Sequence, residues 1–180
     1  MNLRSLLPLD RKLLAVVVLC AACDGVDNID VPVGARARIP ARTLIDDVVG
    51  LVPFDGFGSI DFEQELRNQG VQEEDVDSVR VKTFTITIES PESQTFEFLD
   101  SIAFFVSAEG LAEARIASAA AIDPSVRTLE LALDDVELEP YATAPRMTIR
   151  AEVEGERPEA ETMIEAALTF DVDITVPGCN

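Results

Sequence analysis

The side chains that could carry chemistry in this chain are almost all carboxylates. Its 180 residues include no histidine, the side chain whose ordinary pKa suits proton transfer near neutral pH. Nucleophilic triads and zinc sites built on imidazole are therefore excluded. Asp134 with Asp135 and Asp171 with Asp173 remain as candidates, because glycoside hydrolysis needs two carboxyl groups about 5 to 10 Å apart. Such pairs arise by chance among 34 acidic residues, so we expect no catalytic residue and no enzyme.

Metal and cofactor sites are not expected either. Two clusters have the oxygen-rich composition that calcium prefers, namely Asp24, Asp27, Asn28 and Asp30, and Glu73, Glu74, Asp75 and Asp77. Neither has the spacing of a calcium-binding loop with its central glycine, so we interpret both as solvated acids. The segment Asp55-Gly56-Phe57-Gly58 lacks the Lys-Ser or Lys-Thr pair of a phosphate-binding loop and predicts a turn.

The N-terminus has the order of an export signal. Arg4, Arg11 and Lys12 make a basic start, Leu13 to Leu19 form an apolar run, and Ala21-Ala22 supplies the small residues of a cleavage site. The apolar run is much shorter than the roughly twenty residues of a membrane-spanning helix. We therefore predict a signal peptide over residues 1–22.

Cys23 stands directly after the small pair, and the segment 19–25 resembles the lipidation signal of bacterial lipoproteins. Cys20 occupies the position where those signals usually carry Leu. The resemblance covers residues 1–23 and implies a lipid on Cys23, which would anchor the chain to the inner or outer membrane of a bacterial envelope. Cys179 would then remain as an odd thiol. If an ordinary signal peptidase cuts after Ala22 instead, Cys23 and Cys179 are free to form a disulfide.

The charge of the processed chain limits its partners. Without residues 1–22, 11 basic and 33 acidic side chains remain, a net charge of −22. Such a surface repels nucleic acid and anionic lipid headgroups. We expect no nucleic-acid partner, and membrane contact through the N-terminal lipid only. The acids are spread along the chain, which favours a role in solubility.

The length left after processing suits one domain. Residues 23–34 mix Gly, Pro and Asp and predict a lipidated N-terminus and tether, followed by a domain over 35–180. Two short helices are expected first. One starts at Thr43 and closes at Gly50, and the other runs from a capping Asp61 to a stop at Gly70. The apolar segment 44–54 could alternatively be a loop offered to a partner.

From Val79 onward the apolar period becomes two. Val79 and Val81 alternate in one phase and Phe84, Ile86 and Ile88 in the other, which predicts a β-bulge near Lys82-Thr83. Further alternating sets follow at Ile102, Phe104 and Val106; Ala114 and Ile116; Leu129, Leu131 and Leu133; and Met147, Ile149, Ala151 and Val153. Short, evenly spaced strands favour an all-β, immunoglobulin-like antiparallel sandwich.

The final strand has the clearest pattern, with apolar residues at every even position from 164 to 176. Its length predicts a bend, a bulge or a contribution to both sheets. We expect it to form a hairpin with residues 146–154, placing either Arg146 opposite Asp171 or Arg150 opposite Glu165.

These patterns lead to a functional expectation. The chain reads as a lipid-anchored cell-envelope protein whose non-catalytic sandwich binds or scaffolds another envelope component, a protein or a glycan. One alternative is a carrier that holds an apolar ligand between its sheets. The other is a carboxylate-based glycan hydrolase.

Overall fold

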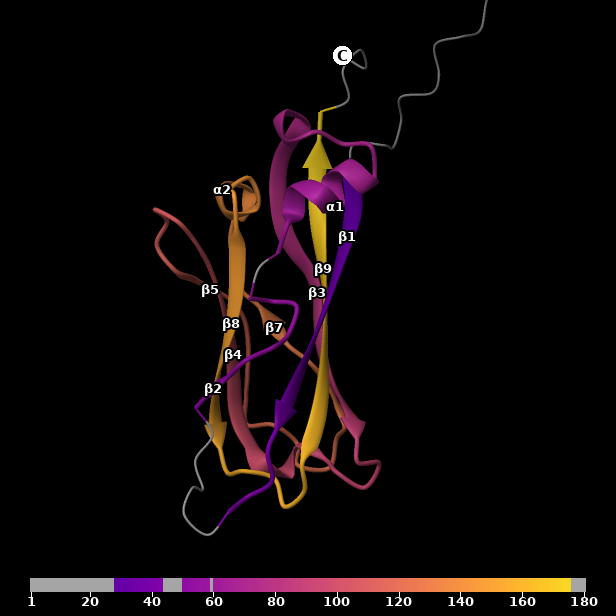
Figure 1. Cartoon of the computed structure of the whole chain (residues 1–180), viewed down its shortest axis with the longest axis vertical. Coiled ribbons are helices and arrows are strands. Elements are labelled where there is room, and N and C mark those ends of the chain that lie inside the picture. The colour runs from indigo at the N-terminus through magenta and orange to yellow at the C-terminus, as the bar shows by residue number, and fades with distance from the viewer. Residues whose placement is uncertain (1–27, 44–49, 59, 176–180) are drawn as a thin grey trace, which may run out of the picture.

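The computed structural model describes residues 28–43, 50–58 and 60–175, and these form a two-layer β-sandwich (Figure 1). Cys23 lies outside the described residues. So do residues 44–49, which make up most of the helix expected over residues 43–50. The elements in chain order are β1 (Asn28–Ile39), β2 (Leu51–Val52), α1 (Phe62–Asn68), the 3-10 helix η1 (Glu73–Asp75), β3 (Val76–Ser90), the 3-10 helix η2 (Phe96–Phe98), β4 (Leu99–Ala108), β5 (Ala114–Ala120), β6 (Thr128–Glu130), β7 (Ala132–Leu133), α2 (Glu139–Ala142), β8 (Met147–Gly155) and β9 (Thr162–Ile174).

The strands are paired as in a long hairpin rolled up on itself. One sheet has the order β1-β9-β3-β6 and the other β2-β8-β4-β5-β7, and all their pairings are antiparallel. Leaving aside the short β7, the first strand pairs with the last, the second with the second last, and so on inward to β4 with β5. This is the connectivity of a jelly roll. The predicted antiparallel sandwich is confirmed, but its strand order differs from the immunoglobulin order that we expected.

The core lies between the sheets and follows the alternation read from the sequence. Every even residue of β9 from 162 to 174 is buried, and Phe170 is fully enclosed, with its ring edge-on to Phe62 of α1 at 5.2 Å. At the centre, the rings of Phe84 from β3 and Phe104 from β4 lie 4.3 Å apart. Phe57, from the predicted turn at 55–58, packs edge-on against both. Turn residues are usually exposed, so this buried ring was not predictable from its segment.

Two local predictions are confirmed. The register of β3 against β9 shifts between Val81 and Thr83, the predicted bulge position. Helix α1 begins after Asp61, whose side chain accepts a hydrogen bond of 2.9 Å from Gln64 N, and Gly70 follows it with a positive φ.

The predicted hairpin between residues 146–154 and the final strand is wrong. β8 pairs with β4 and β2, whereas β9 pairs with β1 and β3 in the opposite sheet. β9 also stays within one sheet. Neither expected register exists, and Arg150 instead pairs with Glu113 and Glu152. Alternation fixes which face of a strand is buried, and two strands that face the same core from opposite sheets have the same pattern.

The expected tether also needs correction, because β1 begins at Asn28 and includes residues 28–34. The odd residues of β1 from 29 to 39 point toward the core, and β1 pairs with β9 from Asn28 to Ile39. Pro32 and Gly34 suggested a loop, but proline is tolerated on an edge strand. Backbone bonds between Arg36 and Asp55, and a bond from the Gln69 side chain to Asp30 O, cover part of this edge.

The set Leu129, Leu131 and Leu133 does not share one buried face. Leu131 is buried and Leu133 is 40% exposed. Leu129 belongs to β6 in one sheet and Leu133 to β7 in the other, and Leu131 lies between the two strands. No single strand therefore contains all three.

Candidate functional site

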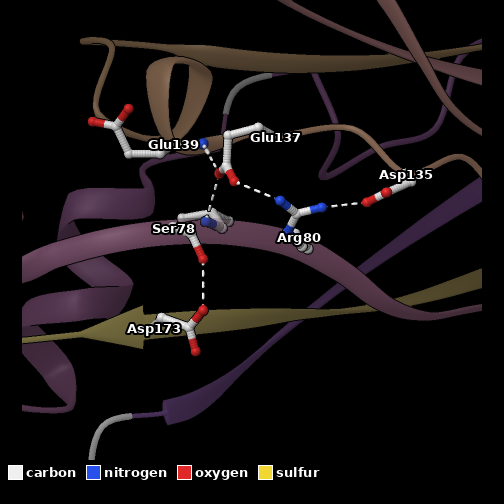
Figure 2. Close-up of polar contacts among 7 residues, drawn as sticks. Ser78, Arg80, Asp135, Glu137, Glu139 and Asp173 are labelled. Carbon is white, nitrogen blue, oxygen red and sulfur yellow. Dashed lines mark hydrogen bonds and ion pairs between the residues drawn. The ribbon is translucent and has the colours of Figure 1, made fainter.

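A group of polar contacts surrounds the first half of β3. We call it the Glu137 cluster, and it comprises Ser78, Arg80, Asp135, Glu137, Glu139 and Asp173 (Figure 2). Glu137 Oε1 accepts hydrogen bonds from Val79 N at 2.8 Å and Glu139 N at 3.1 Å. Its Oε2 accepts from Arg80 Nη2 at 3.2 Å.

This arrangement closes a sheet edge. On that side β3 pairs with β6 only over Thr85–Thr87, which leaves its first half without a neighbouring strand. Leu138 N donates to Val79 O at 2.8 Å while Val79 N donates to the Glu137 carboxylate, so a side chain replaces the missing carbonyl of a partner strand. Unpaired strand edges invite aggregation. We therefore interpret the Glu137 cluster as a structural feature that closes the unpaired edge of β3.

The carboxylate pairs proposed for catalysis are each held by other groups. Arg115 binds both oxygens of Asp134 at 2.8 and 3.0 Å, and Arg80 binds Asp135. Asp173 accepts bonds from Ser78 and Asn28, and Asp171 lies 3.8 Å from Lys82 Nζ.

Asp134, one of the four candidates, and two other carboxyl groups, those of Glu113 and Asp123, are poor proton donors. The hydrogen bond from Arg115 lowers the pKa of Asp134, and that from Arg150 lowers the pKa of Glu113. The hydroxyl of Ser125 likewise lowers the pKa of Asp123. A glycosidase acid needs a raised pKa, so these three carboxyl groups give the hydrolase alternative no support.

Three acids of the clusters considered for calcium are engaged by other protein groups. Asp75 accepts a bond from Gln72 N, and Asp77 accepts one from Thr175 Oγ1 at 2.6 Å. Asp30 is paired with Lys82, whose pKa this hydrogen bond raises. Asp24 and Asp27 lie outside the described residues. Within residues 28–43, 50–58 and 60–175, no group of three or more acids or cysteines is arranged to hold a metal ion.

The described part of the chain contains no helix long and apolar enough to cross a membrane. The part of the segment 44–54 that can be described is not offered to solvent as a whole, because Val52 and Phe54 are buried.

Two surface pockets are lined by described residues. The first, of about 280 Å³, lies between β1 and α1 and includes Asp61 and Gln64, which are already joined by the helix cap. The second, of about 260 Å³, is lined by Arg42, Gln94, Glu97, Phe98, Glu156, Arg157, Pro158 and Glu159. No periodic pattern or motif marks this second set in the sequence, because its members come from three separate connections.

Comparisons with known proteins show only distant likeness. No family model and no curated protein matches the chain. Among solved structures, the chain is similar to the decameric BFDV capsid protein, with a TM-score of 0.41 and 12% identity over 82% of this chain and 98% of that one. It is also similar to Desmodium yellow mottle tymovirus, with a TM-score of 0.29 and 9% identity over 92% of this chain and 99% of that one. Likeness at this level assigns no function, so function has to be argued from the residues.

Proposed function

We propose that this chain is a lipid-anchored protein of the bacterial cell envelope whose jelly-roll domain is a non-catalytic binding module. The observation that carries the proposal is the signal-like order of residues 1–23, with Cys23 directly after the small Ala21-Ala22 pair. The lowered pKa values of Asp134 and Glu113 make these two groups poor proton donors. The carrier alternative is weakened by the Phe84–Phe104 contact, which occupies the centre of the space between the sheets.

The anchor would also orient the domain. Five residue steps separate Cys23 from Asn28, the first residue of β1, and an extended chain spans at most about 18 Å over that length. β1 starts beside α1 and the end of β9 (Figure 1). This end of the sandwich, which we call the α1 end, would therefore stay close to the bilayer. The opposite end, where β1 stops at Ile39, lies about 36 Å further along the strand.

The anchor is tested by changing the two cysteines of the processed chain separately in a bacterial host. Wild-type protein and Cys179→Ser should both partition with membranes and carry a lipid mass on the N-terminal peptide. Cys23→Ser should give an unprocessed or soluble product. An unmodified Cys23 bonded to Cys179 would overturn the lipid anchor and support the disulfide alternative.

A further inference from the structure

The residues that line the second pocket come from the connections after β1, between β3 and β4, and between β8 and β9. In Figure 1 these connections lie at the end of the sandwich far from α1. The three connections build the walls of the pocket, and backbone hydrogen bonds join them. Arg42 N donates to Pro158 O at 2.8 Å, and Glu156 N donates to Phe98 O at 2.9 Å. The walls are thus fixed by the fold before any ligand arrives, which lowers the ordering cost of binding.

The lining includes a buried amide and two buried apolar side chains. Gln94 is only 7% exposed, and its Nε2 donates to Thr95 O at 2.9 Å. Phe98 and Pro158 are buried beside it. Burial of a polar side chain is costly unless it is hydrogen-bonded, and here the Gln94 amide donates to the neighbouring Thr95 O.

Arg42 is held more loosely than Arg38. Its two terminal nitrogens lie 3.5 Å from Glu156 Oε2 and 3.5 Å from Glu159 Oε1, and these carboxylate side chains are 73% and 86% exposed. By contrast, Arg38 contacts Glu161 at 3.1 Å. Contacts at the outer limit of hydrogen-bond length between exposed groups are weak. A ligand with better-placed oxygens therefore has little to displace at Arg42.

The chemistry of the lining indicates the class of ligand. Arg42, Arg157, Gln94 and the three glutamates are all planar side chains that present donors or acceptors in pairs, and adjacent hydroxyl groups on a sugar ring offer matching pairs. The lining holds two positive arginines and three negative glutamates, so its charges nearly cancel and it does not strongly favour a ligand with a net charge. Drug-sized ligands occupy pockets from about 300 Å³ upward, so the volume of about 260 Å³ suits one sugar ring.

We propose that this pocket binds a neutral sugar unit of an envelope glycan. The proposal rests on the proposed function. A lipid anchor would place the protein in the envelope and leave this pocket at the end of the domain far from the bilayer. A free amino acid is the competing ligand class, because arginine and glutamate together also suit a carboxylate and an ammonium group.

The test uses the full-length protein in detergent, titrated with glucose, N-acetylglucosamine and their disaccharides, and separately with glutamate. Binding is followed by calorimetry and by the NMR signals of the Gln94 side-chain amide. We expect saturable binding of at least one neutral saccharide with a shift of the Gln94 amide. Arg42→Met should weaken it about tenfold or more, as expected when a hydrogen bond from a charged group is lost.

Arg38→Met is the matched control, because it removes an arginine and an ion pair four residues away without touching the pocket lining. It should leave the affinity unchanged. Absence of saturable saccharide binding, binding of glutamate alone, or an equal loss in both variants would each overturn the pocket proposal. Membrane partition is read separately. Absence of saccharide binding by a lipidated wild-type chain overturns the pocket proposal alone. A wild-type chain that binds saccharide but carries no lipid overturns the anchor alone.

Discussion

Phe170 shows how much a single buried residue of β9 should contribute to stability. It is fully buried against Phe62, while its neighbour Thr169 lies on the outer face of the same strand. Phe170→Ala should lower the free energy of unfolding by about 3 to 5 kcal/mol, because it removes a buried ring and leaves a cavity. Thr169→Ala should change it by no more than about 0.5 kcal/mol. Denaturant unfolding of both variants measures the contrast, and equal losses would contradict the assigned burial.

Glu137 is the residue on which the closed edge of β3 depends. Glu137→Ala would leave Val79 N without its acceptor, and a part-buried backbone donor without a partner costs about 1 to 3 kcal/mol. Hydrogen exchange at the Val79 amide should accelerate in step with that loss. Glu139→Ala is the control, since Glu139 contributes only its backbone nitrogen to the cluster, and it should stay within about 0.5 kcal/mol. Similar exchange rates in both variants would argue against the edge-closing role.

At the scale of elements, the end of β8 depends on a glycine. Gly155 has a φ of +144°, and a Cβ there would lie against the backbone of Phe98, Leu99 and Asp100. Gly155→Ala should therefore destabilise the protein by about 1 to 3 kcal/mol through backbone strain, with the steric clash in addition. The junction of β8 with β4 should loosen with it, as thermal or chemical unfolding would reveal.

Gly58 provides the contrasting case in the 55–58 turn. A Cβ there meets nothing within 4 Å, and its φ lies outside the left-handed region. Gly58→Ala should be neutral or should stabilise by about 0.4 to 1 kcal/mol, because alanine restricts the unfolded chain. Destabilisation of equal size at both glycines would show that strain at Gly155 is not the cause.

At the scale of the whole molecule, the short link between Cys23 and β1 sets the expected orientation. In vesicles that hold the lipidated protein, a fluorophore at Glu74→Cys in η1 should be quenched by headgroup-attached quenchers. One at Glu92→Cys, beyond the end of β3, should be quenched much less. Both variants are made with Cys179→Ser so that the label is unique. The net negative charge of the protein opposes an arrangement in which the long side of the sandwich lies on an anionic bilayer. Equal quenching at the two positions would refute the orientation.

Local patterns determined which residues face the core. The even residues of β9, the bulge near Lys82, and the cap at Asp61 were predictable because side-chain alternation, register shifts and capping bonds depend only on neighbours along the chain. The alternating residues of β1 carry the same information, although Pro32 and Gly34 obscured it.

Only the tertiary structure decided which strands are neighbours and which loops meet. β8 and β9 present equivalent inward faces, so their assignment to opposite sheets depends on how all the strands pack around one core. The pocket at Arg42 and Gln94 and the contact between Glu137 and Val79 join segments more than fifty residues apart. Such contacts leave no periodic trace in the sequence, because each side chain is selected by a partner that is distant along the chain.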